Sequence, residues 1–220
     1  MEPTPVCAKK PGLEIWIVRH GETDWNQRGI IQGQSESTLS ELGSSQARLV
    51  AAALAGISWW RICSSDLVRC RQTTKLILTP PPSDSCADSD SDPDETEEKE
   101  GEPADGPATH SETAADGMLH VGSHVVRLDP RLREMSAGIY EGLPRGITYK
   151  KAVRIKADEA GLSVEAFTAR GSIQVHEDPA QFRARASSFL DWAIAEYMQE
   201  LADREELGEG NLTRWKGSDR

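Results

Sequence analysis

The spacing of apolar residues along this chain changes between strand-like and helix-like stretches. Residues 14–18 form a short run of branched and aromatic side chains, which is typical of a buried parallel strand. The stretch at 61–64 predicts the end of a second strand. Alternating apolar and polar positions at 124–128 predict a third strand.

Helical spacing of the apolar positions predicts four helices, at residues 40–55, 66–78, 144–158 and 179–203. Ser40 is placed to cap the first helix, and Ser65 or Asp66 is placed to open the second. Because strands and helices alternate along the chain, we expect an α/β fold. The expected architecture is a three-layer αβα sandwich with a mostly parallel sheet.

The charge of the chain is concentrated in one segment. Between Pro80 and Gly117 there are thirteen Asp and Glu residues against one Lys, a net charge of −12 within a chain total of −11. The same segment has one residue from the strongly apolar types, Cys86. It cannot bury enough surface to offset the entropy of ordering, so we expect a disordered, solvated insert. A phosphorylation-prone or partner-binding role stays open for this insert.

These patterns predict one domain that is interrupted once. We expect a flexible N-terminus at 1–12, a domain made of 13–79 and 121–207, an acidic insert at 80–120 and a flexible tail at 208–220. Outside the acidic segment the chain carries a charge of about +1, which is compatible with a local basic pocket for an anion.

The cysteines and the N-terminus predict a cytoplasmic protein. Four cysteines form no Cys-x-x-Cys pair and no spacing typical of metal ligands, which favours reduced thiols. The first residues lack a basic segment followed by an apolar one, so no signal peptide is expected. No apolar run approaches the ~18 residues of a membrane-spanning helix, so we expect no membrane partner.

A histidine next to an arginine follows the first predicted strand. Arg19, His20 and Gly21 come directly after the apolar run, at the end of a strand where open α/β sheets bind their ligands. A neutral imidazole beside a fixed cation suits nucleophilic chemistry on a phosphate. A single histidine after a strand is also common as a purely structural residue, so this motif needs further partners.

Three other stretches supply candidate partners. Asn26 and Gln32 offer amide donors, and Gly33 lets the backbone approach an oxyanion closely. Arg69 falls in the first turn of a predicted helix, where the helix N-terminus and a guanidinium together favour a phosphate. Glu134 offers a proton donor. Taken singly, Arg69 and Glu134 are also consistent with solvated surface charges.

In this order, these motifs resemble the histidine phosphatase (phosphoglycerate mutase-like) superfamily, and within it the TIGAR-type fructose-2,6-bisphosphatases. The resemblance rests on Arg-His-Gly-Glu-Thr at 19–23, Ile-Ile-Gln-Gly-Gln at 30–34, Ser-Ser-Asp-Leu at 64–67 with Arg69, and Leu-Arg-Glu at 132–134 with Glu-Gly at 141–142. It implies a phosphoglycerate mutase-like fold over roughly residues 13–78 and 124–203.

The resemblance also implies a mechanism. His20 would become a phosphohistidine, and Glu134 would protonate the leaving alkoxide and then help to activate water. The residues implied in substrate binding are Arg19, Asn26, Gln32, Gly33 and Arg69. No metal or other cofactor is expected, because arginines supply the positive charge that phosphoryl transfer requires.

One part of the family pattern is missing from this sequence. The family carries a second histidine on a late core strand, after the long helix, and His176 precedes that helix. We therefore expect a C-terminally truncated, incomplete domain, in which the loss of one cationic donor lowers the rate by about 10²–10³.

Three functions stay open. The first is a phosphatase acting on a small sugar phosphate, with fructose-2,6-bisphosphate as the best candidate. The second is a catalytically weak remnant that binds phosphorylated ligands or a protein, and the third is a phosphoglycerate mutase-type phosphotransferase. In each case the expected ligand is phosphorylated and nucleic acid is not expected. The sequence does not determine the oligomeric state.

Overall fold

The computed structural model describes residues 12–79, 117–171 and 173–206. The α-helices are α1 (Asp24–Gln27), α2 (Glu41–Ala53), α3 (Val68–Leu78), α4 (Tyr149–Glu159), α5 (Val164–Ala169) and α6 (Pro179–Glu206). The strands are β1 (Ile62–Ser64), β2 (Met118–Val121) and β3 (His124–Leu128), and two short 3-10 helices are η1 (Pro130–Leu132) and η2 (Gly138–Tyr140).

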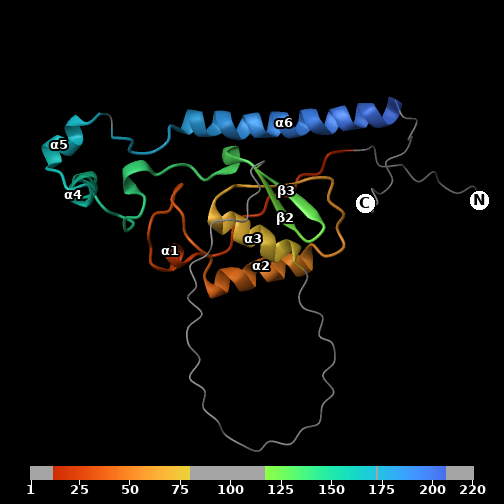
Figure 1. Cartoon of the computed structure of the whole chain (residues 1–220), viewed down its shortest axis with the longest axis horizontal. Coiled ribbons are helices and arrows are strands. Elements are labelled where there is room, and N and C mark those ends of the chain that lie inside the picture. The colour runs from red at the N-terminus through yellow and green to blue at the C-terminus, as the bar shows by residue number, and fades with distance from the viewer. Residues whose placement is uncertain (1–11, 80–116, 172, 207–220) are drawn as a thin grey trace, which may run out of the picture.

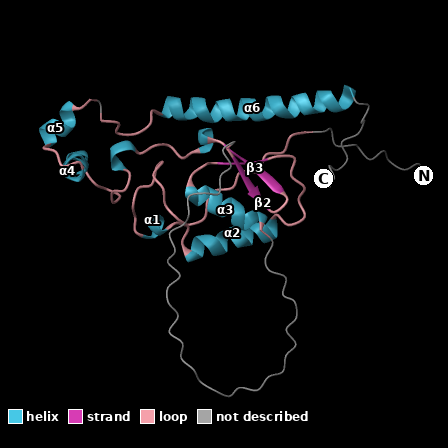
Figure 2. Cartoon of the chain, viewed as in Figure 1, coloured by secondary structure: helices cyan, strands magenta, loops and turns pink. Residues whose placement is uncertain are grey.

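A small sheet lies between two layers of helices. Its strand order is β1-β3-β2, with β1 parallel to β3 and β2 antiparallel to β3. Figure 1 shows α6 on one side of this sheet and α2 with α3 on the other. The predicted αβα layering is therefore present, but the described sheet is mixed rather than mostly parallel. Figure 2 shows how short the strands are beside the helices and loops.

The buried apolar residues form two clusters. One lies at the sheet, where Leu119, Val121 and Val126 are buried and Leu78 of α3 packs against them. The other lies around η2 and α4 and contains Ile139, Leu143, Ala152 and Val153. The second cluster therefore holds in place the segment that follows Glu134.

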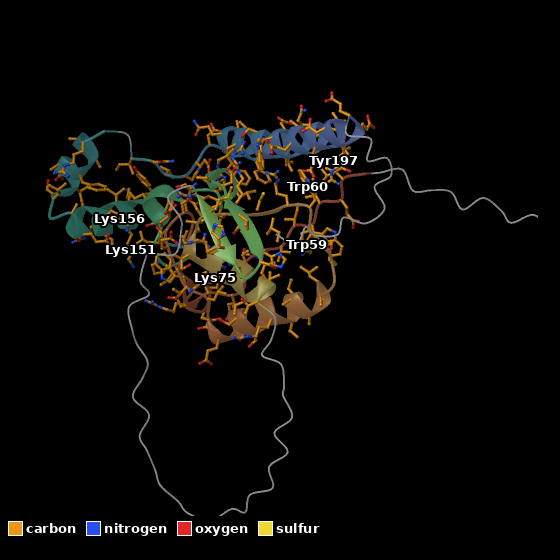
Figure 3. All side chains as sticks on the ribbon, turned by 45° about the vertical axis from the view of Figure 1, so that its right-hand side comes forward. Trp59, Trp60, Lys75, Lys151, Lys156 and Tyr197 are labelled. Carbon is orange, nitrogen blue, oxygen red and sulfur yellow. The ribbon has the colours of Figure 1, made fainter. Side chains whose placement is uncertain are left out.

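Aromatic and charged side chains connect α6 to the sheet. Trp60, just before β1, meets Tyr197 of α6 edge to face, with ring centroids 5.3 Å apart (Figure 3). The guanidinium of Arg127 on β3 lies 4.1 Å from the centroid of the Trp192 ring, and Arg61 pairs with Glu196 at 3.2 Å. These contacts, rather than a continuous apolar stripe, attach the helix to the strands.

Several predicted elements are confirmed. The side chain of Ser40 accepts a hydrogen bond from the backbone N–H of Gly43 and caps α2 as expected. The strands predicted at 61–64 and 124–128 correspond to β1 and β3, and α6 covers the long helix predicted at 179–203.

Three predicted boundaries are wrong. Helix α3 begins at Val68 instead of 66, because Asp66 forms an ion pair with Arg133 rather than capping the helix. Helix α4 begins at Tyr149 rather than 144, because Pro144 forms a bridge with Ile30. The insert was expected to reach residue 120, but Met118–Val121 forms β2, since β3 supplies its ladder partners. Residues 80–116 of the predicted insert, residues 1–11 of the predicted N-terminal tail and the whole predicted C-terminal tail lie outside the described residues.

The predicted strand at 14–18 does not form. None of these residues pairs with a strand among the described parts of the chain, and the side chains are exposed, Ile17 by 90% and Trp16 by 51%. An apolar run is buried as a strand only where neighbouring backbone offers hydrogen-bond partners. Trp16 instead meets Trp59 edge to face, with centroids 6.1 Å apart. Among the described helices, none is long and apolar enough to cross a membrane.

Candidate active site

The turn that carries His20 is fixed to α3. The backbone N–H of Gly21 donates to the Thr73 hydroxyl at 3.2 Å, and that hydroxyl donates to the carbonyl of Arg69 at 2.8 Å. Gly21 also packs directly on Gly43 of α2, where a Cβ at position 21 would lie 2.9 Å from the Gly43 Cα. Glycine is therefore required at both positions, and the turn that carries His20 is held against both α2 and α3.

The imidazole of His20 is suited to act as a nucleophile. Its Nδ1 lies 2.8 Å from the carbonyl oxygen of Gly21. A carbonyl oxygen can only accept, so Nδ1 carries the proton and Nε2 keeps its lone pair. Burial lowers the pKa of His20, and the charges of Arg69 and Arg19 lower it further against the opposing effects of Gly21 and Glu134. The neutral form is thus favoured.

Arg69 is the most deeply buried charged side chain near this turn, with an exposed fraction of 0%. Its guanidinium donates to the carbonyl oxygens of Ser35 at 2.9 Å and of Gly33 at 2.7 Å. It also donates to a carboxylate oxygen of Glu134 at 3.1 Å. The Nε atom of Arg69 is buried without a hydrogen-bond partner among the described residues. The sequence prediction had Arg69 at the site, and here it also joins α3 to two loops.

The loop after His20 presents the predicted amides. The Asn26 carboxamide oxygen accepts from the backbone N–H of Thr23 in a capping box that begins α1, which leaves the amide nitrogen to donate elsewhere. Gln32 is buried, and its oxygen accepts from the Ser37 hydroxyl. Both side chains are therefore held through their oxygens and oriented by local hydrogen bonds.

Gly33 occupies a position that no other residue type fits. Its φ is +53°, and a Cβ there would lie 2.7 Å from the backbone nitrogen of Ala137 and would also overlap the Glu141 carboxylate. Because the left-handed region and the crowding both penalise a side chain, glycine lets the loop approach the 134–141 segment closely.

Glu141 holds these two segments together, a role that sequence reasoning did not assign to it. One carboxylate oxygen accepts from the backbone N–H groups of Gln34 at 3.0 Å and Ala137 at 2.8 Å, and the other accepts from the Ser35 hydroxyl at 2.8 Å. Burial raises the pKa of Glu141, but these hydrogen bonds outweigh it and the net pKa is lowered. Its position in the family motif was the only signal.

A pocket of about 450 Å³ brings most of the predicted site residues together. The lining residues include Arg19, Asn26, Gln32, Gly33 and Glu134. His20 and Arg69 are not among the lining residues, although Arg69 contacts both Glu134 and Gly33. The side chain of Glu134 is half exposed, which leaves its carboxylate accessible.

The same pocket includes residues that the sequence did not predict. Arg145, Tyr140 and His176 are part of its lining. His176 was not expected in the site because it precedes the long helix, yet the chain returns it to the pocket, where its Nδ1 lies 3.0 Å from the carbonyl of Glu177. No sequence signal could place it there, because the pocket is lined by segments that are far apart in the sequence. Among the described residues there is no cluster of ligands that could hold a metal ion.

Comparison with known families gives one match that covers most of the chain. The profile of the histidine phosphatase superfamily (branch 1) matches residues 15–85 and 110–202. The match includes every predicted site residue and both α-helical layers. Together with the observed layering, it confirms the predicted α/β fold class.

The curated relatives that match this chain carry a mutase name. Proteins named "Probable phosphoglycerate mutase GpmB" from Yersinia pestis (strain Pestoides F) and Yersinia pseudotuberculosis serotype O:1b (strain IP 31758) are each 35% identical over 132 residues, which are 60% of this chain. The chain spans 42% of the length of these curated relatives.

Two solved structures are similar in shape. The phosphoglycerate mutase from Thermus thermophilus is 22% identical with a TM-score of 0.42, covering 79% of this chain and 68% of that one. A mycobacterial glucosyl-3-phosphoglycerate phosphatase in complex with VO3 is 25% identical with a TM-score of 0.45, covering 80% and 64%.

Proposed function

Because the chain belongs to the histidine phosphatase superfamily, branch 1, we propose that it hydrolyses a phosphomonoester of a small sugar phosphate through a phosphohistidine at His20. One observation carries this proposal. The neutral imidazole of His20 has a free Nε2, and it interacts electrostatically with Arg69, Arg19 and the acid Glu134. These are the groups that an in-line displacement at phosphorus requires.

The proposed reaction has two steps. In the first, Nε2 of His20 attacks phosphorus and the P–O ester bond breaks, while protonated Glu134 gives its proton to the leaving oxygen. In the second, water attacks the phosphohistidine, Glu134 takes up the proton of that water, and inorganic phosphate leaves with His20 restored. Arg19 and Arg69 stabilise the charge on the phosphoryl oxygens in both steps.

We propose fructose-2,6-bisphosphate as the best candidate substrate. Arg145 and His176 also line the pocket, and Arg145 offers positive charge for a second phosphate, while Arg19 serves the phosphate that is transferred. The pocket volume of about 450 Å³ falls within the range of small-molecule sites. A phosphorylated small molecule is the proposed partner, and the cytoplasm is the proposed location.

A second candidate is a protein that binds phosphorylated ligands without turnover. It is favoured by residues 14–18, which lead into His20 but are exposed and form no strand ladder with the described residues. Without a strand before it, the turn that carries His20 is held mainly by Gly21.

Covalent trapping separates the two candidates. Incubation with radiolabelled fructose-2,6-bisphosphate should label the protein, and the label should be acid-labile and absent in His20→Ala. His120→Ala is the matched control, because His120 is exposed on β2 away from the pocket lining. Release of labelled phosphate supports the phosphatase, and transfer to added 3-phosphoglycerate would favour a mutase. Saturable ligand binding with no covalent label would favour the binding protein.

A further inference from the structure

Arg185 of α6 uses every donor that it has. Its Nε–H donates to one carboxylate oxygen of Glu177 at 2.6 Å, and an N–H of Nη2 donates to the other at 2.8 Å. Its remaining N–H groups reach the carbonyl oxygens of Arg131 at 2.8 Å, Arg133 at 2.7 Å and Glu134 at 2.9 Å. A guanidinium has five N–H donors, and all five are engaged here.

Glu177 binds the same segment from its other end. It is buried, with an exposed fraction of 9%, and its carboxylate accepts from the backbone N–H of Ser136 at 3.2 Å. The backbone N–H of Glu177 in turn donates to the carbonyl of Ser136 at 2.8 Å. The bond to Arg185 outweighs burial and lowers the pKa of Glu177, so the carboxylate stays ionised at neutral pH.

Together the two residues fix the main chain on both sides of Glu134. Arg185 holds the carbonyls that lead into it, and Glu177 holds Ser136 just after it. The Glu134 carbonyl receives one more bond, from the side chain of Gln34 at 3.2 Å. By contrast, the Glu134 side chain is half exposed, and Arg69 is its one ion-pair partner among the described residues. The position of the Glu134 carboxylate is therefore determined mostly by the hydrogen bonds to the main chain around it.

We propose that the Arg185–Glu177 pair is a positioning device for the proton donor Glu134. The proposal rests on the proposed function, in which Glu134 must reach the leaving oxygen. Displacement of a reacting group by about 1 Å can lower a rate by about 10²-fold. The pair lies on α6 and the loop before it, so it couples the outer helix layer to the geometry of the site.

Lysine and methionine at position 185 test the proposal. Lysine keeps the charge, but its three donors spread from one nitrogen and cannot span a carboxylate and three carbonyls. With fructose-2,6-bisphosphate as substrate, whose alkoxide leaving group needs a proton, and with rates normalised to the folded fraction, we expect Arg185→Lys and Arg185→Met to lower kcat by about 10–100-fold with little change in KM. Glu177→Gln should act in the same direction.

The matched control is Arg183→Met, two residues away on the same helix, where the arginine is exposed and makes no hydrogen bond to a described residue. A second readout does not depend on turnover. Backbone order parameters of residues 133–136 from NMR should be about 0.85 in the unmodified protein and fall below about 0.6 in both Arg185 variants.

The outcomes separate this inference from the proposed function. Unchanged kcat per folded molecule, or an equal loss in Arg183→Met, overturns the positioning role. If the unmodified protein has no phosphatase activity, the proposed function fails. In that case unchanged order parameters in the Arg185 variants still overturn the positioning role, and a selective loss of order at 133–136 still supports it.

Discussion

Replacement of Arg69 by methionine should destabilise the fold as well as the site. The side chain is fully buried and gives charged hydrogen bonds to the carbonyls of Gly33 and Ser35. Each bond of this kind contributes about 1.5–3 kcal/mol, and methionine would leave both carbonyls without this donor. The lost contact with half-exposed Glu134 adds little, because water screens it.

Part of the loss is offset, because methionine removes the cost of burying a guanidinium. We therefore expect the free energy of unfolding to fall by about 2–4 kcal/mol. For a chain of this size that corresponds to a decrease in Tm of about 4–16 °C. Arg69→Lys, which keeps the charge but not the forked geometry, should give a smaller decrease.

Thermal unfolding followed by circular dichroism measures this effect. Arg48→Met is the control, because Arg48 is exposed on α2 and makes no hydrogen bond to a described residue. A Tm for Arg69→Met within about 1 °C of that of Arg48→Met, equivalent to about 0.3 kcal/mol, would refute the conclusion that Arg69 joins α3 to the loop of Gly33 and Ser35.

Two further predictions concern protonation and backbone geometry. The pKa of His20 is lowered in the folded state, so as the pH falls the unfolded chain takes up a proton at a higher pH than the folded protein does. The free energy of unfolding should therefore decrease as the pH drops below ~6.5. Urea unfolding of the unmodified protein and of His20→Asn at pH 7.5 and 5.5 checks this, and a stability difference that is the same at both pH values would contradict it. A side chain at a positive φ costs about 1–3 kcal/mol, and Gly33→Ala should lower the free energy of unfolding by more than this because crowding adds to the strain. Gly29→Ala is its control, because Gly29 has a similar φ of +64° with open space around it, and equal losses in the two variants would exclude a contribution from crowding.

Local sequence was sufficient where an element depends on its own residues. The Ser40 cap and the apolar spacing after it predicted α2, and alternation predicted β3. Local sequence failed where pairing decides the outcome. The run at 14–18 has the composition of a buried strand but no ladder partner among the described residues, whereas β2 forms beside β3 although it was assigned to the insert.

For the candidate site, the order of motifs predicted which residues converge. Arg19, Asn26, Gln32, Gly33 and Glu134 were all named from sequence, and all five line one pocket. His20 and Arg69 were named as well and are not among the lining residues. The geometry of single motifs has a local reason, such as a glycine at a positive φ or an amide in a capping box, whereas the expectation that the motifs converge came from their order along the chain and from the family resemblance.

The sequence by itself thus determined the four longer helices, the order of the motifs and the chemical types of the groups that meet. Only the tertiary structure brought Arg185 to the carbonyls around Glu134 and His176 to the pocket wall. It also made Glu141 the link between two loops. The physical reason is that the bonds from Arg185 to the Glu134 carbonyl and from Gln34 to Glu141 join residues dozens of positions apart. Their formation depends on how helices and loops pack rather than on any pattern of neighbouring residues.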